Sequence, residues 1–209
     1  VKAINSKLGI ISVDQLEMAA RDHKVCKLPG FGEKIEKSIL ENIDQVRDSK
    51  VRIRLYDAEE IVNRILSYMD KQRVVENIIV AGSFRRRRET VRDIDILATG
   101  KDSAEIVSRF LKYPEIHRVL VQGDTRCTVV MNSGLHVDIR VVPQKSYGAA
   151  LHYFTGSKDH NIGIRKRGVK LGLKINEYGI FKGKIRIGGE YEKDVFRAVG
   201  MQFIEPELR

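Results

Sequence analysis

The chain has 209 residues, of which 42% are apolar and 32% charged, a composition typical of a folded protein rather than a disordered one. No apolar run approaches the roughly 20 residues that span a bilayer, so a transmembrane helix is excluded and no membrane partner is expected. Lysine and arginine total 38 against 28 acidic residues, and this net charge of +10 favours nucleic acid as a partner ahead of an acidic membrane surface.

The first fifty residues have the pattern of a helical module. Ser12, followed three residues later by Gln15, forms a capping box that predicts a helix to about Asp22. A Pro-Gly-x-Gly turn within Leu28–Lys34 leads into a second helix. The apolar residues at helical spacing in that second helix are Ile35, Ile39, Leu40, Ile43 and Val46.

A third helix follows a polar stretch between Asp48 and Asp57, which is the expected boundary of the module. Asp57, with Glu60 three residues later, predicts the cap of this helix. Its expected core residues are Ile61, Val62, Ile65, Leu66 and Met69.

The remaining chain alternates between strand and helix patterns, which predicts a mixed α/β domain followed by a small α+β tail. The expected strands are Ile78–Ala81, Asp93–Thr99, Val119–Gln122, Thr125–Met131 and Leu135–Val142. The expected helices are Ser103 to about Lys112, Tyr147–Thr155, Asp159–Lys170 and one near Glu192–Val199. Gly156 and Gly172 end the second and third of these helices. A hairpin is expected around Lys182-Gly183.

The segment from Gly82 to Asp95 carries the strongest chemical pattern. Gly82 permits close approach of a ligand to the backbone, and Ser83 with the run Arg85–Arg88 offers donors suited to phosphate oxygens. Asp93 and Asp95 are two residues apart in a strand, so both carboxylates point to one side. Paired carboxylates favour a cation between them, and Mg²⁺ is the natural partner of hard oxygen ligands and phosphates.

A third carboxylate, Asp138, lies in the strand Leu135–Val142 on the face opposite the apolar residues, together with His136 and Arg140. If this strand neighbours Asp93–Thr99, the three carboxylates meet and can hold two divalent ions for phosphoryl or nucleotidyl transfer. An alternative for Asp138 is ion pairing around Arg140 or plain solvation. Asp-x-Asp, Gly-Ser or an arginine run alone is weak; their joint occurrence between two strands is more specific.

Cys26 and Cys127 are far apart, and the spacing indicates neither a Cys-x-x-Cys motif nor a Cys/His cluster. We therefore expect reduced, structural thiols and no zinc site.

The Gly82–Asp95 segment resembles the nucleotidyltransferase signature of Gly-Ser followed by Asp-x-Asp and, more narrowly, that of the X family of DNA polymerases. The narrower resemblance rests on Asp138–Pro143, Tyr153–Ser157, Asn161, Arg165 and Asn176–Gly179. It covers residues 55–209 densely. Residues 1–50 resemble the helix-hairpin-helix region of bacterial and archaeal members, and Pro206–Arg209 resembles the start of their linker to a phosphoesterase domain. The chain, which begins without Met, is therefore expected to be a core cut from a longer protein.

The resemblance implies helical helix-hairpin-helix fingers over 1–54, a nucleotidyltransferase palm with a mixed β-sheet over 55–144, and a small α+β thumb over 145–209. It implies a monomeric, intracellular, cytoplasmic enzyme associated with a prokaryotic nucleoid. The activity implied is template-directed, gap-filling DNA synthesis from deoxynucleoside triphosphates. The implied partners are primer-template or gapped DNA.

The resemblance also implies roles for individual residues. Asp93, Asp95 and Asp138 are the implied catalytic and metal-binding residues for two Mg²⁺ ions, with Mn²⁺ as an alternative. The implied nucleotide contacts are Gly82, Ser83 and Arg86 to the triphosphate, Tyr153, Phe154 and Gly156 at the sugar, and Asn161 at the base. The implied DNA contacts are Gly30, Gly32, Lys34, Arg140 and Arg165, with Arg140 also beside Asp95. From the residues alone, ordinary helix-end packing is the alternative for Tyr153 and Phe154, and a solvated helix face for Asn161 and Arg165.

The chain departs from the family pattern in places. Arg87 stands where animal members have Gly, Val91-Arg92 replaces a small Ser-Gly step, and His136 replaces an Arg. We expect a stiffer phosphate loop and altered primer positioning, and no lyase activity is implied. Two other functions stay open: another nucleotidyltransferase, which tails RNA or modifies small molecules or proteins, and a catalytically inactive DNA-binding module.

Overall fold

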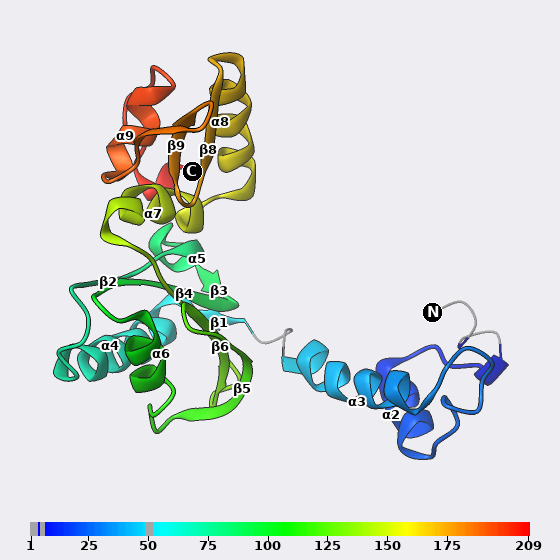
Figure 1. Ribbon diagram of the computed structural model, residues 1–209. Coiled ribbons are helices and arrows are strands. Elements are labelled where there is room, and N and C mark those ends of the chain that lie inside the picture. The colour runs from blue at the N-terminus through cyan, green and yellow to red at the C-terminus, as the bar shows by residue number, and fades with distance from the viewer. Residues whose placement is uncertain (1–3, 5–6, 49–51) are drawn as a thin grey trace. The chain divides into compact units, whose positions relative to one another are not determined.

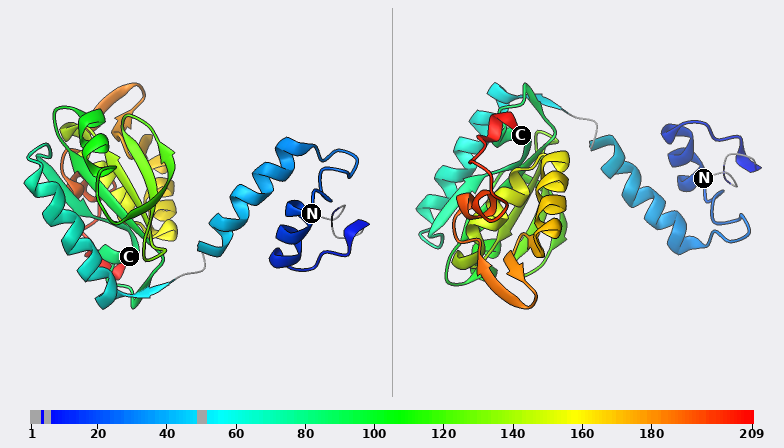
Figure 2. Two further views of the ribbon diagram at one scale, coloured as in Figure 1. Left: turned by 90° about the horizontal axis from the view of Figure 1, so that it is seen from below. Right: turned by 90° about the horizontal axis from the view of Figure 1, so that it is seen from above.

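The computed structural model describes residues 4, 7–48 and 52–209 (Figures 1 and 2). The chain divides into two compact units, Val1–Val51 and Arg52–Arg209. No helix among the described residues combines the length and apolar character needed to cross a membrane.

The first unit is a helical hairpin built from α2 (Val13–Arg21) and α3 (Glu33–Asp48). The Ser12 side chain caps α2 by accepting a hydrogen bond from the Gln15 backbone N–H at 3.2 Å. The Gln15 side chain accepts from Ile11 rather than from Ser12, so only half of the expected capping box forms. The small core comprises Ile4, Ala19, Ala20 and Val25, with Leu8, Ile10, Leu16, Leu28, Phe31, Ile39 and Leu40 packed around it.

Two details of the expected second helix can be checked in α3. Ile43 is buried, whereas Ile35 is 42% exposed and lies outside the apolar face. Val46 is outside the residues whose side chains are described.

The second unit contains a five-stranded sheet in the order β2-β4-β7-β6-β5. Only β4 and β7 run parallel in this sheet; its other neighbours are antiparallel. The sheet strands are β2 (Asn77–Val80), β4 (Asp93–Thr99), β5 (Ile116–Gln122), β6 (Arg126–Met131) and β7 (His136–Val141). A separate two-stranded ribbon joins β1 (Ile53–Arg54) to β3 (Thr90–Val91).

One face of this sheet is covered by α4 (Leu55–Lys71) and α6 (Ser103–Phe110), as Figure 1 shows. Ile94, Ile96 and Ala98 of β4 join the helices in the main hydrophobic core. Because side chains alternate along a strand, Asp93 and Asp95 are directed to the opposite face. The core therefore fixes which face of the sheet can bind a ligand.

The C-terminal part of this unit holds α7 (Tyr147–Thr155), α8 (Lys158–Lys170), α9 (Glu192–Ala198) and a three-stranded antiparallel sheet. Its strands are β8 (Leu173–Asn176), β9 (Gly179–Lys182) and β10 (Ile185–Gly188), and the short helices η1 (Gln144–Ser146) and η2 (Pro206–Leu208) flank the region. A second core forms here from Ala149, Ile164, Ile175, Ile180, Val195, Phe196 and Val199.

Several local expectations were wrong. Asp57 lies inside the first turn of α4 and pairs with Arg54 at 2.9 Å instead of capping the helix. Asp102, not Ser103, caps α6, because its carboxylate accepts from the Glu105 N–H at 3.0 Å. Pro206 and Arg209 are buried, and the Arg209 guanidinium stacks on Phe196 of the second core, so the expected linker start is part of the folded region.

Candidate active site

The three aspartates singled out in the sequence lie on two adjacent strands. In the parallel pairing of β4 with β7, Asp95 is directly opposite Asp138, and Asp93 is opposite His136. All lie on the sheet face that α4 and α6 leave open, since Ile94, Val137 and Ile139 occupy the core face. The strand neighbourhood on which the acidic site depends is therefore present.

Asp95 has the most perturbed environment of the three. Its pKa is raised to about 7, first because the carboxyl is largely buried and then because the carboxylates of Asp93 and Asp138 repel its charge. The guanidinium groups of Arg140 and Arg86 counteract this only in part. A bound cation would offset the burial and the repulsion that disfavour the charged form of this carboxyl.

The other two carboxylates each have local partners. Asp93 pairs with Arg92 at 3.3 Å. Asp138 accepts a hydrogen bond from the Thr128 hydroxyl at 3.2 Å through Oδ2. Its buried Oδ1 accepts no hydrogen bond, and the nearest cationic atom is Nε of Arg140 at 3.5 Å. In the part of the chain that the structure describes, the oxygens of these three carboxylates do not all lie within 4.8 Å of one another. An orphaned buried oxygen and mutual repulsion fit a site for divalent cations.

Asp95→Asn is expected to stabilise the metal-free protein at pH 8 by up to about 4 kcal/mol, the equivalent of a shift of about three pKa units. Between about pH 4 and pH 7 the folded state retains a proton that the unfolded chain has released, so wild-type stability falls as the pH rises through that window. The variant has no charged carboxylate at this position and so lacks this loss of stability. The difference in unfolding free energy between variant and wild type should vanish below pH 4. Denaturant unfolding in chelator at both pH values measures it, with exposed Asp124→Asn as control; equal wild-type and variant stability at pH 8 contradicts it.

The Gly-Ser segment forms a short helix that sequence patterns did not predict, α5 (Gly82–Arg85), immediately after β2. Gly82 has φ +62°, and a Cβ there would lie 2.1 Å from Oδ2 of Asp95. Only glycine allows this backbone to approach the carboxylate so closely. Arg87 also adopts a left-handed φ of +54° and pairs with Glu59. This is the position at which the sequence departs from the Gly of the animal polymerases described above.

A pocket of about 340 Å³ joins the Gly-Ser segment, the aspartates and the C-terminal helices. The expected residues that line it are Gly82, Ser83, Arg86, Asp93, Asp95, Tyr153, Phe154, Gly156, Asn161 and Arg165, and Lys158 joins them. Asp138 and Arg140 lie outside this lining, although the Arg140 guanidinium stacks 4.7 Å from the centroid of the Phe154 ring. Gly30, Gly32 and Lys34 belong to the other unit.

Hydrogen bonds hold the pocket walls in place. The Asn161 amide donates to the Tyr153 carbonyl at 2.7 Å, while its buried Oδ1 has no partner. Arg165 Nε donates to the Asn161 carbonyl at 3.3 Å. Arg86 donates to the Thr155 carbonyl, and burial followed by repulsion from Arg88 lowers the pKa of its guanidinium. The side chains are thus oriented with polar capacity left over for a ligand.

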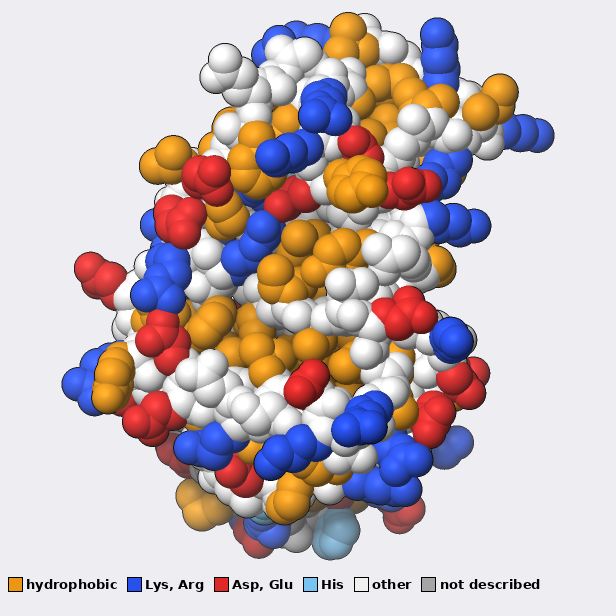
Figure 3. Space-filling view, turned by 90° about the vertical axis from the view of Figure 1, so that its left-hand side faces the viewer, with side chains coloured by type: hydrophobic (Ala, Val, Ile, Leu, Met, Phe, Trp, Pro, Cys, Tyr) orange, Lys and Arg blue, Asp and Glu red, His pale blue; other side chains and the backbone are white. Residues whose placement is uncertain are grey.

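A second, basic hollow adjoins this pocket and shares Ser83, Arg86 and Asp93 with it. Its further arginines are Arg52, Arg87, Arg88 and Arg92. By contrast, Figure 3 shows a face of the molecule where basic and acidic side chains are interspersed. The arginines of the hollow outnumber its acidic residues Glu89, Asp93 and Glu207, so it carries an excess of positive charge suited to a phosphate-rich ligand.

Sequence reasoning missed the ion network that holds α5 against the C-terminal region. Glu192 of α9 accepts two hydrogen bonds from the Arg85 guanidinium, both at 2.8 Å, and one from Arg209 at 2.6 Å. Arg85 also donates to the Thr155 hydroxyl at 2.6 Å. Arg85 and Glu192 are 107 positions apart in the chain, so no local pattern connects them.

Comparison with known proteins shows what the chain is similar to. The family model described as the DNA polymerase beta thumb matches residues 150–209. DNA polymerase/3'-5' exonuclease PolX of Bacillus subtilis is 32% identical over the whole chain. Over its whole length the chain is therefore similar to a DNA polymerase of the X family. It spans only 37% of the length of that Bacillus relative, and 28% of rat DNA polymerase lambda, which is 27% identical over 63% of this chain.

Shorter family members and solved structures extend the comparison. Repair DNA polymerase X of African swine fever virus is 25% identical over 64% of this chain, which covers 82% of the viral protein. Two structures of Leishmania infantum polymerase beta, a ternary primer/template complex and a ternary gap complex, superpose with TM-scores of 0.77 and 0.78. The first match covers 100% of this chain and 92% of the Leishmania chain, and the second covers 99% and 83%. Sequence identity is 22% in both. They show that this chain shares the mixed α+β fold of those structures.

Proposed function

We propose that the chain is the polymerase core of an X-family enzyme that extends a primer 3′-hydroxyl on gapped DNA with deoxynucleoside triphosphates and releases pyrophosphate. The observation that carries the proposal is the juxtaposition of Asp93 and Asp95 with Ser83, Arg86 and Tyr153 in one pocket, with Asp138 beside Asp95. The Leishmania structures, a primer/template complex and a gap complex, support DNA of this kind as the substrate.

Asp93, Asp95 and Asp138 would hold two divalent cations, Mg²⁺ or Mn²⁺. The lack of a hydrogen bond to Oδ1 of Asp138 and the repulsion around Asp95 are what such ions would relieve. When bound, they would supply charge neutralisation and a lowered pKa for the attacking hydroxyl. The chain itself contributes the rigid placement of the carboxylates on adjacent strands, which pre-organises the site.

Ser83 and Arg86 would bind the triphosphate, with the adjoining arginines favouring its charge and that of the departing pyrophosphate. Tyr153, Phe154 and Gly156 would line the sugar and disfavour a 2′-hydroxyl by crowding. Asn161 retains one free amide hydrogen for a base edge after bonding to Tyr153. Arg165 would then contact the template strand.

The first unit would add affinity for DNA. Gly30, with φ +85°, begins the turn that leads into α3, and Gly32 and Lys34 are exposed beside it. Backbone amides and a lysine at such a turn can bind a DNA phosphate. Because the net charge is +10, binding by the monomeric chain should weaken as salt rises.

Gly82→Ala is expected to slow nucleotide incorporation about 10²-fold by displacing the Asp95 carboxylate, since a misplacement of about 1 Å can cost that much. It should also destabilise the fold by about 1–2 kcal/mol, because alanine is strained at positive φ. Gly172→Ala is the matched control: Gly172 has φ +71° and a Cβ added there would meet no atom within 4 Å, so stability alone should fall. Equal incorporation rates in the two variants contradict the proposed role of Gly82.

Extension of a labelled primer on gapped DNA, with each deoxynucleotide and each ribonucleotide, tests the proposed activity. Template-matched addition of deoxynucleotides that chelator abolishes is expected. Addition without a template, or of ribonucleotides only, would indicate another nucleotidyltransferase. Tight DNA binding without any addition would indicate an inactive binding module.

A further inference from the structure

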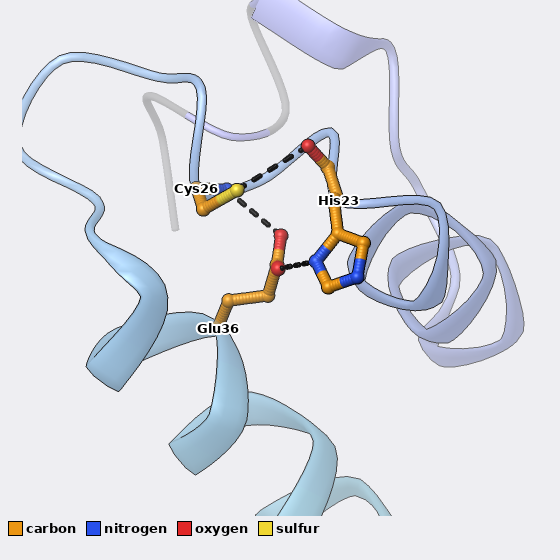
Figure 4. A group of neighbouring side chains, drawn as sticks. All are labelled: His23, Cys26 and Glu36. Atoms are coloured by element: carbon orange, nitrogen blue, oxygen red, sulfur yellow. Dashed lines mark hydrogen bonds and ion pairs between the residues drawn. The ribbon is translucent and has the colours of Figure 1, made fainter.

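The first unit contains a cluster of metal-ligating side chains remote in sequence from the aspartates. His23 follows α2, Cys26 lies in the connecting turn, and Glu36 lies in the first turns of α3 (Figure 4). Their ligand atoms all lie within 4.8 Å of one another, and they are the one such group of three or more in the described part of the chain. The sequence-based expectation that no Cys/His cluster exists was therefore wrong, because the third member comes from the next helix.

The contacts within the cluster hold the three residues close together. Glu36 Oε1 lies 2.7 Å from Nδ1 of His23, and Glu36 Oε2 accepts the Cys26 backbone N–H at 2.8 Å. The Cys26 thiol donates to the His23 carbonyl at 3.3 Å. The Glu36 side chain is only 3% exposed, whereas that of His23 is 75% exposed. A buried carboxylate is thus fixed by a backbone donor through one oxygen, and its other oxygen contacts the imidazole of the exposed His23.

We propose that His23, Cys26 and Glu36 bind one Zn²⁺ ion, with water as the fourth ligand. Nδ1, Sγ and Oε1 are the ligands, and thiolate with imidazole selects zinc over magnesium. The thiol releases its proton to solvent and the neutral imidazole carries its proton on Nε2. The charges of zinc, thiolate and carboxylate then sum to zero.

The geometry requires only small adjustments. Ligand atoms around tetrahedral zinc are about 3.3–3.8 Å apart, as bond lengths of about 2.0–2.3 Å dictate. The Nδ1–Oε1 pair, now 2.7 Å apart, must open by less than about 1 Å, and a pair at the 4.8 Å limit must close by about 1.3 Å. The exposed His23 side chain can make this movement without disturbing the core.

The position of the cluster gives the ion a structural role. It would join the end of α2 to the first turns of α3 across the turn Leu28–Lys34. The core of this unit is small, with alanines at Ala19 and Ala20 among its four buried members. Small units commonly gain stability from a metal because their hydrophobic core is limited.

Cobalt substitution of the 209-residue chain, under a non-thiol reductant, tests the site. One equivalent of Co²⁺ should produce a thiolate-to-cobalt charge-transfer band that Zn²⁺ abolishes by displacement. Cys127→Ala should keep the band and Cys26→Ser should lose it. Cobalt bound to aspartates cannot produce a thiolate band, so the band reports on the cysteine site alone, and adding cobalt beyond one equivalent offsets any uptake by the aspartates. Absence of the band in wild-type protein, or its survival in Cys26→Ser, overturns the proposal.

Hydrogen exchange provides a second readout that does not depend on spectroscopy. At free Zn²⁺ 100 times its dissociation constant, exchange that proceeds through opening of the cluster should slow by about 100-fold. The slowing should affect peptides covering residues 23–36 and should be absent in His23→Ala and Cys26→Ser. Exchange unchanged by zinc in the wild-type chain contradicts the site and leaves a simple hydrogen-bonded cluster.

Discussion

Asp138→Ala is expected to slow primer extension by about 10³-fold or more while leaving DNA affinity nearly unchanged. Asp138 lies opposite Asp95 across β4 and β7, and its Oδ1 has no hydrogen-bond donor in the protein. A metal ion contributes several kcal/mol to stabilising transition-state charge, and about 1.4 kcal/mol corresponds to a factor of ten in rate. Single-turnover incorporation on gapped DNA and a filter-binding titration measure the two effects separately.

The matched control for Asp138 is Asp124→Ala, which removes an exposed aspartate from the turn between β5 and β6. It should extend primers at the wild-type rate. Parallel losses of extension and DNA binding in Asp138→Ala would mean that Asp138 supports the fold rather than the reaction.

Glu192→Ala is expected to destabilise the protein by about 3–5 kcal/mol, because it leaves two buried guanidinium groups without a counter-charge. The Glu192 side chain is 8% exposed, and those of its partners Arg85 and Arg209 are 18% and 0% exposed. Since total stability is typically about 5–15 kcal/mol, this loss is large. Urea unfolding of the 209-residue chain measures it.

Glu190→Ala serves as the control for Glu192. The Glu190 side chain is 59% exposed, and its ion pair with Arg186 is long, at 4.0 Å. Its effect should stay within about 0.5 kcal/mol. Burial alone would raise the pKa of Glu192, but hydrogen bonds from Arg85 and Arg209 lower it below its usual 4.5. The network therefore stabilises the fold above that pH and loses its contribution as the pH falls through the lowered pKa. A Glu192→Ala protein as stable as Glu190→Ala would contradict the network's importance.

Much of the sheet could be predicted because strand alternation has a strict period of two. Asp93–Thr99 was predicted to the residue, and the open face carrying Asp93, Asp95 and Asp138 followed from the apolar residues between them. The parallel pairing of β4 with β7 could only be assumed, because β5 and β6 intervene in the chain and periodicity does not specify which strands are neighbours.

Local helix patterns failed where tertiary contacts decide the structure. The short helix at Gly82–Arg85 has no periodic apolar face, and it persists because Arg85 and Arg86 are bound to α7 and α9. The predicted cap at Asp57 also failed. Its carboxylate pairs with Arg54, three residues earlier, instead of accepting a hydrogen bond from the start of the helix. Long-range hydrogen bonds at Gly82–Arg85 and a local ion pair at Asp57, rather than propensity, determine these positions.

The central proposal is that Asp93, Asp95 and Asp138 together hold the metal ions that position a nucleotide in the adjoining pocket. Anomalous diffraction from crystals of the chain with gapped DNA, Mn²⁺ and a non-hydrolysable deoxynucleoside triphosphate tests it most directly. We expect manganese peaks bound by all three carboxylates, with the triphosphate against Ser83 and Arg86. Manganese bound elsewhere, or a triphosphate seated away from Ser83, would contradict it.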